Sequence, residues 1–239
     1  MAEISLRKLD TTDFHTQETY KALRTNISFC GDDIHTIAIT SSFPNEGKSE
    51  VSLRLAYAFA ETGAKTILVD ADIRNSKLGE KLGVTAQTGL THVLSGKEKN
   101  LQGTVKKTDI ESLDILFPGA NAPNPAELLG KERFTLLLQL LREKYDYVII
   151  DCPPLIPVID AAIIAKQCDG TLMVISQGDV RKRDAKKSLD QLKLSGAHIL
   201  GTVLNKVEIT QKKYGKYGKY GKYGRYGKYG RYGYQPPTA

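Results

Sequence analysis

The sequence has no apolar run long enough to cross a bilayer. None of its 239 residues belongs to an uninterrupted hydrophobic stretch near the ~20 residues that a membrane-spanning helix needs. The N-terminus also lacks the charged region and following apolar region of a secretory signal. We therefore expect a cytoplasmic protein.

Cysteine and histidine are scarce, with three and four copies. Cys30, Cys152 and Cys168 are odd in number and lack metal-ligand spacing, and two of them lie in or beside apolar runs. Reduced, structural thiols are the favoured interpretation. Neither a disulfide framework nor a Cys/His metal site is expected.

Acidic residues are absent after Glu208. Eight of the 34 basic residues lie beyond position 211, so residues 1–211 carry 26 basic and 27 acidic residues. The positive charge therefore belongs to the C-terminal segment, and the larger part of the chain is not a basic nucleic-acid module. A length of about 210 residues suits one large α/β domain followed by a tail.

The tail repeats the unit Tyr-Gly-Lys/Arg and contains nothing aliphatic to bury. Glycine at every third position gives the backbone freedom, so we expect a flexible segment with a span of about 30 Å that presents its phenols. The repeat has no proline, which excludes collagen. A polyanion-binding or phase-separating tract, a spacer and a string of modification sites remain open. The tyrosines are Tyr214, Tyr217, Tyr220, Tyr223, Tyr226, Tyr229, Tyr232 and Tyr234.

Short apolar runs alternate with helix-length amphipathic segments. The alternation favours an α/β fold with a doubly wound, mostly parallel sheet flanked by helices. In such a sheet, ligands bind at the carboxyl ends of the strands. The predicted strands are 36–40, 66–69, 147–150, 171–175 and 199–204, and the predicted helices are 49–61, 125–143, 160–166 and 180–194.

The first predicted strand leads directly into a phosphate-binding loop. The phosphate-binding motif GxxxxGK[ST] is matched at its end by Gly47, Lys48 and Ser49. Ser42 replaces the first glycine of the motif. Backbone amides and the following helix N-terminus would cradle phosphates, Lys48 would reach the outer phosphates and Ser49 would offer its hydroxyl to Mg²⁺. The nucleotide contacts are predicted at Ser42, Pro44, Asn45, Glu46, Gly47, Lys48, Ser49 and Glu50.

Three acids follow the ends of two other predicted strands. Asp70 and Asp72 come after 66–69, and Asp151 comes after 147–150. One such acid is often a helix cap or a surface residue. Three that converge on a lysine loop indicate a metal-nucleotide site, because unpaired buried carboxylates are costly without a cation.

Five stretches together resemble the bacterial tyrosine kinases of capsule and exopolysaccharide export. The resemblance covers residues 15–234, includes the tyrosine cluster and implies a P-loop NTPase fold whose members phosphorylate their own tail tyrosines. It implies an oligomerisation segment at 1–33, a kinase domain at 34–209 and a tyrosine cluster at 210–239. The stretches are Asn-Glu-Gly-Lys-Ser at 45–49, Val-Asp-Ala-Asp-Ile-Arg at 69–74, Asn-Pro-Ala-Glu-Leu-Leu at 124–129, Asp-Tyr-Val-Ile-Ile-Asp-Cys-Pro-Pro at 146–154 and Val-Leu-Asn-Lys at 203–206.

The resemblance also implies roles for the site residues, with ATP and Mg²⁺ as cofactors. Lys48 would stabilise the transferred phosphoryl group, and Asp70 would accept the phenol proton. Ser49, Asp72 and Asp151 would hold Mg²⁺, and an exchange of roles between Asp70 and Asp72 stays open. Asn205 resembles the adenine-contacting position, although a plain turn residue is an equal alternative. Glu50 replaces a common hydroxyl residue, which puts one phosphate contact in doubt.

The N-terminal segment carries a second family feature. Glu18, Lys21 and Arg24 resemble an assembly motif through which family members meet in a ring, with lysine where arginine is usual. We expect these residues to share one side of a helix, and a simply solvated face is an equal alternative. In a ring, the tail of one subunit would reach the site of another.

Family resemblance implies further partners. A separate membrane co-polymerase protein would activate the kinase and recruit it to the inner face of the membrane, and a protein-tyrosine phosphatase would reverse the reaction. No specific nucleic acid is expected. The alternative function is a partition or positioning ATPase whose basic tail binds nucleic acid. The missing basic face on residues 1–211 disfavours it.

Overall fold

The computed structural model describes residues 4–6, 9, 13–98 and 100–207. The chain divides into two units, Met1–Val207 and Glu208–Ala239, and the tail tyrosines lie outside the described residues. No helix in the described ranges is both long and apolar enough to span a membrane. The elements are α2 (Phe14–Ser28), β1 (Thr36–Ser41), α3 (Lys48–Ala60), β2 (Thr66–Asp70), α4 (Leu78–Lys81), α5 (Leu90–Leu94), α6 (Leu101–Thr104), β3 (Val105–Lys107), β4 (Leu113–Leu116), α7 (Pro125–Gly130), α8 (Glu132–Lys144), β5 (Tyr147–Asp151), α9 (Asp160–Ala165), β6 (Gly170–Ser176), α10 (Lys182–Leu194) and β7 (Ile199–Asn205).

The strands form one seven-stranded sheet in the order β3-β4-β2-β5-β1-β6-β7. All neighbouring pairs are parallel except β3 with β4, which are antiparallel at one edge. Every residue of β1 and β2 is buried, which explains why these strands consist of apolar residues and threonine without alternation up to their last residues, Ser41 and Asp70. The register sets Asp70 opposite Asp151, so the acid-bearing ends of β2 and β5 are adjacent.

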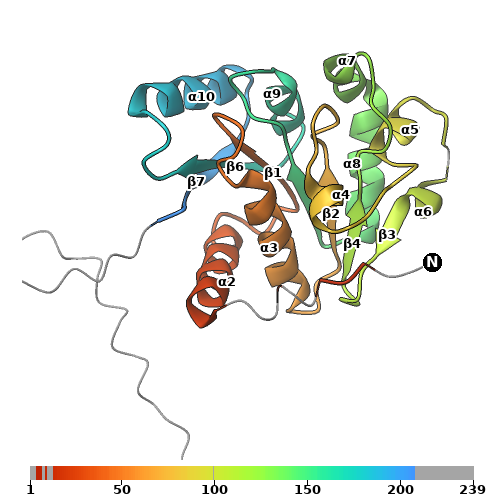
Figure 1. Cartoon of the computed structure of the whole chain (residues 1–239), viewed down its shortest axis with the longest axis horizontal. Helices are drawn as coiled ribbons and strands as arrows, with labels where there is room; N and C mark the ends of the chain where they lie inside the picture. Colours follow the sequence, from red (N-terminus) through yellow and green to blue (C-terminus); the bar gives the residue numbers. More distant parts are fainter. Residues whose placement is uncertain (1–3, 7–8, 10–12, 99, 208–239) are drawn as a thin grey trace, which may run out of the picture. The chain divides into compact units, whose positions relative to one another are not determined.

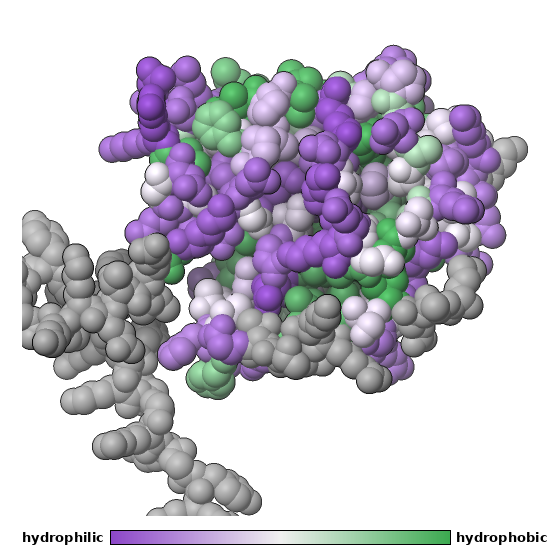
Figure 2. Space-filling view, viewed as in Figure 1, coloured by the Kyte–Doolittle hydropathy of each residue, from purple (hydrophilic) through white to green (hydrophobic). Residues whose placement is uncertain are grey.

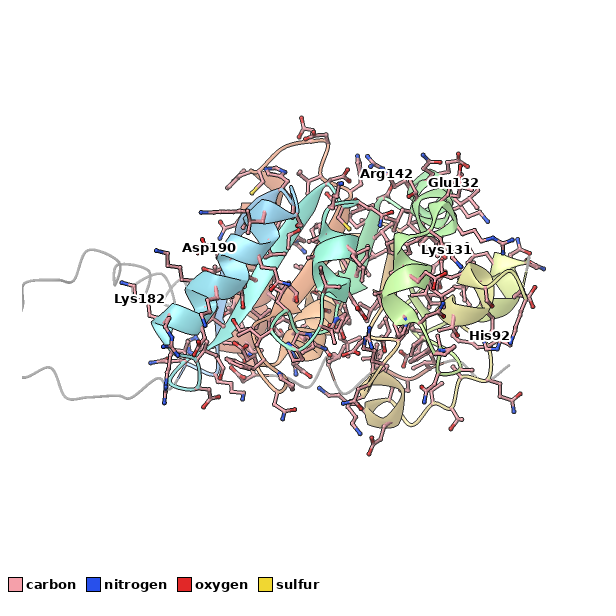
Figure 3. The ribbon with its side chains drawn as sticks, turned by 90° about the horizontal axis from the view of Figure 1, so that it is seen from above. His92, Lys131, Glu132, Arg142, Lys182 and Asp190 are labelled. Carbon is pink, nitrogen blue, oxygen red and sulfur yellow. The ribbon has the colours of Figure 1, made fainter. Side chains whose placement is uncertain are left out.

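Helices cover both faces of the sheet. On one face α2 contacts α3, and both contribute to a core that includes Ile39 of β1 and Phe59 of α3 (Figure 1). On the other face α8, α9 and α10 contribute to a second core, and Figure 3 shows them along this face with Arg142 on α8 and with Lys182 and Asp190 on α10. Hydrophilic residues cover the outer end of α10 in Figure 2. The arrangement confirms the doubly wound α/β prediction.

Two details differ from the sequence prediction. The helix expected over 125–143 is two helices, α7 and α8, because the chain is extended at Lys131 with φ −75° and ψ 151°. The short strands β3 and β4 were not predicted. β4 contains the buried Asp114, which interrupts its apolar run, and β3 has only three residues.

Candidate active site

The phosphate-loop residues 42–47 turn the chain from the end of β1 into α3. Asn45 and Gly47 have positive φ angles of 66° and 92°, a region that glycine adopts freely and asparagine tolerates. A Cβ atom on Gly47 would lie 2.1 Å from Nδ2 of Asn205, so a larger residue here would displace the Asn205 side chain and hold a strained backbone. No side chain caps the α3 N-terminus, and its first amides are the groups that bind phosphate in such loops.

Glu46 fastens this loop to the sheet. Its carboxylate is almost fully buried and accepts the backbone N–H of Phe43 at 2.6 Å and that of Ser176, at the end of β6, at 3.0 Å. The side chain therefore holds the loop in shape. Any contribution of Glu46 to nucleotide binding falls to its backbone.

Two other loop residues have side chains engaged elsewhere. The buried hydroxyl of Ser42 accepts a hydrogen bond from Ser188 of α10 at 2.9 Å, and Ser42 has no positive φ that would require the usual glycine. The Glu50 carboxylate pairs with Arg54 and with Lys81 of α4. The Glu50 side chain is therefore directed at two cations, and its predicted phosphate contact stays a prediction that would fall to the backbone N–H.

Lys48 and three aspartates meet at the carboxyl edge of the sheet. Lys48 begins α3, Asp70 ends β2, Asp72 follows two residues later and Asp151 ends β5. The lysine Nζ lies 3.2 Å from Oδ2 of Asp72 and 3.9 Å from Oδ1 of Asp151, and it lies 3.4 Å from Oγ of Ser49. All four charged residues are buried. The structure thus brings together residues that are up to 103 positions apart between Lys48 and Asp151.

One ammonium group faces more carboxylate charge than it can neutralise. Burial raises the pKa of Asp70 well above its usual value, and Asp151 raises it further, although the Ser76 hydroxyl opposes both effects. Burial also raises the pKa of Asp151 against the opposing charge of Lys48. Burial lowers the pKa of Lys48, but Asp151 and Asp72 together outweigh burial and raise it. The lysine is therefore charged at neutral pH, and the acids still lack positive charge.

The residues fit a magnesium ion that arrives with a nucleotide. Within the described ranges, no three His, Cys, Asp or Glu side chains are arranged to hold a metal by themselves. Mg²⁺ at nucleotide sites needs only one or two protein oxygens, because phosphates and water complete its octahedron. Ser49, Asp72 and Asp151 offer such oxygens beside Lys48. Their buried negative charge favours a cation here.

Three residues that were not predicted as site residues support these acids or the segment that follows β2. Ser52 donates to Oδ1 of Asp151 at 3.3 Å, and the Ser76 hydroxyl donates to Asp70. Arg74 makes two hydrogen bonds of 2.6 and 3.0 Å to Asp160, which is fully buried at the start of α9. Only Arg74 had a sequence signal, since it belongs to the stretch 69–74. The contacts of Ser52 and Arg74 join segments that are 99 and 86 positions apart, whereas Ser76 lies only six positions from Asp70.

Asn205 lies beside the phosphate loop at the end of β7. Its Nδ2 donates to the backbone oxygen of Glu46 at 2.9 Å. A contact with adenine would therefore fall to the amide oxygen, which can accept from an exocyclic amine. The sequence expectation for Asn205 stays a prediction.

The three α2 residues do not share one outward side. Glu18 and Lys21 form an exposed pair at 3.0 Å, whereas Arg24 donates to the backbone oxygen of Ala58 in α3 at 2.6 Å. A helix advances 3.6 residues per turn, so positions six apart are separated by about 120°. This corrects the shared-side expectation, because Arg24 anchors α2 to its own subunit.

Comparisons with known proteins match this architecture. Residues 34–206 match the family described as AAA domain. The chain is 44% identical over 217 residues to tyrosine-protein kinase CpsD of Streptococcus pneumoniae serotype 4, covering 89% of this chain and 93% of the relative. It is 37% identical over 201 residues to tyrosine-protein kinase YwqD of Bacillus subtilis, covering 83% and 84%.

Solved structures resemble it as well. The kinase domain of the Escherichia coli tyrosine kinase ETK superposes with a TM-score of 0.78 at 30% identity, covering 85% of this chain and 80% of that chain. The chimerical protein CapA2B2 superposes with a TM-score of 0.76 at 34% identity, covering 80% of this chain and 84% of that chain. The septum site-determining protein MinD of Pyrococcus horikoshii, complexed with Mg-ADP, superposes with a TM-score of 0.61 at 28% identity. The match covers 72% of this chain and 70% of that chain.

Proposed function

This chain belongs to the bacterial tyrosine-protein kinases, and we propose that it transfers the γ-phosphoryl group of ATP to tyrosines in the C-terminal cluster of a neighbouring copy. The kinase activity and the P-loop NTPase fold follow from relatives up to 44% identical over nearly its full length. The observation that carries the proposal is the buried cluster of Lys48 with three aspartates at the end of the phosphate loop. The repeat of tyrosines supplies the acceptor.

Positioning and charge account for most of the catalysis. Backbone N–H groups of Asn45, Glu46 and Gly47 would cradle the phosphates, with Pro44 shaping the loop and Lys48 on the transferred group. Mg²⁺, held by Ser49, Asp72 and Asp151, would neutralise charge that develops on the phosphate oxygens. The similarity of this chain to MinD complexed with Mg-ADP supports nucleotide and magnesium binding by the phosphate loop.

Asp70 is our candidate for the proton acceptor. A tyrosine phenol has a pKa near 10 and must lose its proton as it attacks. Asp70 is buried but communicates outward through Ser76, whose hydroxyl donates to it and also lines the adjacent cavity. A phenol in that cavity could replace the hydroxyl of Ser76 or pass its proton through it. Asp72 remains tied to Lys48.

The cellular role follows from the capsule-type relatives. We assign residues 1–33 to oligomerisation through the exposed pair Glu18 and Lys21, residues 34–209 to the kinase domain and residues 210–239 to the substrate cluster. A ring of copies would regulate polysaccharide synthesis and export. A separate membrane co-polymerase protein would activate it and recruit it to the membrane, and a tyrosine phosphatase would reset it. The existence of a separate activator is supported by the similarity to CapA2B2, because that protein is a chimera. This chain aligns with 84% of it.

The test separates transfer between copies from transfer within one. A Lys48→Met chain with an intact tail is mixed with an active chain whose eight tail tyrosines are phenylalanine, and γ-labelled ATP is added. We expect the Lys48→Met chain alone to lose at least about 100-fold in labelling, and the mixture to restore label to its tail. Lys65→Met, at an exposed position, is the matched control.

Two outcomes contradict the proposal. If the Lys48→Met tail is never labelled in the mixture, transfer between copies is wrong. If the wild-type chain releases label only as inorganic phosphate, the chain behaves as the alternative positioning ATPase and the acceptor assignment fails.

A further inference from the structure

Two adjoining cavities lie beside the catalytic cluster on the side away from β7. The nearer cavity, of about 490 Å³, is lined by the segment that follows β2 and by the loop that follows β4. The farther one, of about 250 Å³, lies between α5 and the loop that leads into α7. Asn121 lines both. His92, labelled in Figure 3, lines the farther cavity. We call the pair the β2–β4 groove.

The groove begins where the transferred phosphate would be. The phosphate loop lies at β1, and Asn205 bounds it on the β7 side. Lys48 extends from this loop toward Asp72 and Asp151, which belong to the β2 and β5 ends. The outer phosphates that such a lysine binds therefore lie toward β2. Figure 1 shows β7 on one side of this edge and β2, α4 and α5 on the other.

Asp72 connects the two sites. It is more than nine-tenths buried, is bonded to Lys48 and also lines the nearer cavity. A group entering from this cavity therefore meets the catalytic cluster from the side opposite the phosphate loop. In-line displacement requires the acceptor oxygen to approach the γ-phosphorus opposite the leaving oxygen of ADP, which the phosphate loop would hold.

The walls suit a basic peptide rather than a lipid or a metabolite of another class. The nearer cavity has polar walls that include Ser76 and Asn75, and its size lies within the ~300–1,000 Å³ of ligand pockets. Its arginine, Arg74, is already neutralised by Asp160. Glu80 on α4 is exposed, with only a loose 3.5 Å contact to Lys77. Negative charge therefore predominates near Asp72, whereas Lys97 lines the far cavity.

We propose that the β2–β4 groove is the acceptor site of this kinase and holds the Tyr-Gly-Lys/Arg segment of a second copy, with Glu80 pairing a basic residue beside the acceptor tyrosine. The inference rests on the proposed function. The tail carries eight basic residues and no acidic one after Glu208, which complements the groove. Glycine beside each tyrosine allows the backbone to lie close to the cavity wall. Glu80 is a specificity-determining residue, not a catalytic one.

A charge swap at Glu80 tests the pairing. The full-length kinase, with its own tail tyrosines changed to phenylalanine, is assayed with γ-labelled ATP and two peptides, one of Tyr-Gly-Lys repeats and one of Tyr-Gly-Glu repeats. Glu80→Lys is expected to raise KM for the lysine peptide about three- to tenfold at low salt and to lower KM for the glutamate peptide. Glu143→Lys is the matched control, because residue 143 is exposed near the start of β5, at the opposite edge.

A second variant tests the location without altering charge. Asn121→Trp places a large ring at the exposed residue that both cavities share. We expect KM for the lysine peptide to rise at least about fivefold while the dissociation constant for fluorescent ADP follows that of Glu143→Trp. A parallel loss of nucleotide affinity would instead show damage to the phosphate loop and overturn the assignment.

The outcomes separate this proposal from the proposed function. If the unaltered kinase labels the lysine peptide but neither Glu80→Lys nor Asn121→Trp changes its KM, the acceptor binds elsewhere and the kinase assignment stands. If no peptide tyrosine is labelled by the unaltered kinase, both proposals fail. Equal KM changes for both peptides in Glu80→Lys would show a shape defect and refute the charge pairing.

Discussion

Replacing Glu46 with glutamine tests whether this side chain holds the phosphate loop. Its two carboxylate oxygens each accept one backbone N–H, from Phe43 at 2.6 Å and from Ser176 at 3.0 Å. A glutamine side chain has the same shape but only one oxygen. One of the two N–H groups must then face an amide NH₂, which cannot accept a hydrogen bond. No rotation of the amide restores both bonds.

The expected loss follows from the burial of this contact. A hydrogen bond to a charged group contributes about 1.5–3 kcal/mol, and a buried donor left unpaired costs about 1–3 kcal/mol. These terms overlap, so we expect Glu46→Gln to lower the free energy of unfolding by about 3 kcal/mol. For a domain of this size, that corresponds to a fall in Tm of roughly 6–12 °C. Glu46→Ala, which loses both bonds, should fall further.

The assay combines unfolding with nucleotide binding. Urea denaturation followed by circular dichroism gives the stability, and titration with fluorescent ADP gives the affinity. We expect the affinity to fall about tenfold, since a loosened loop must be ordered again on binding. Glu61→Gln, at the exposed end of α3, controls for loss of a carboxylate. A Tm within 2 °C of wild type for Glu46→Gln would refute the anchoring role.

Two further predictions concern groups buried near the site. Asp70 has a pKa raised by burial and by Asp151, so the folded state holds its proton more tightly than the unfolded chain. Its contribution to stability is thus full below about pH 4 and is lost as pH rises through the folded pKa. Asp70→Asn should therefore raise Tm at pH 7 and flatten its pH dependence in melts from pH 4 to 8, while labelling is lost; an unchanged pH slope would contradict this. Arg74→Met leaves Asp160 buried without its partner and should lower the urea-unfolding free energy by about 2–3 kcal/mol, most of which Asp160→Asn should restore in the double variant; equal losses in the single and double variants would show that the pair does not act as a unit.

The central strands could be predicted because burial on both faces requires an uninterrupted run of apolar residues, which the sequence shows. β1 and β2 are covered on both faces, so apart from Ser41 and Asp70 at their ends they consist of continuous apolar and β-branched residues. β3 and β4 could not be predicted from the sequence. β3 has only three residues, and it forms because it pairs with β4 at the edge of the sheet. The break between α7 and α8 was missed because the helical spacing of apolar residues continues through Lys131.

The acids of the site could be predicted for a similar reason. Asp70 and Asp151 end strands, and parallel strands deliver their carboxyl ends to one edge. The supporting roles of Glu46 and Arg74 could not be predicted, although both residues belong to recognised stretches, because these roles arise from contacts over long separations. Glu46 reaches Ser176 across 130 positions, and Arg74 reaches Asp160 across 86. A sequence pattern shows which residues can react, whereas tertiary packing decides which ones support them.

The charge distribution of the chain also explains how a modified tail would leave the proposed acceptor groove. Residues 1–211 are nearly neutral, but Asp72 and Glu80 concentrate negative charge at one end of the groove, and the tail brings eight basic residues. Each phosphotyrosine adds roughly −1.5 to −2, so eight of them add about −12 to −16 and reverse the sign of the tail. The attraction that presents an unmodified tyrosine therefore becomes repulsion once several neighbours carry phosphate. On this reasoning, the repeat's basic residues serve substrate capture before transfer, and the phosphates themselves drive product release.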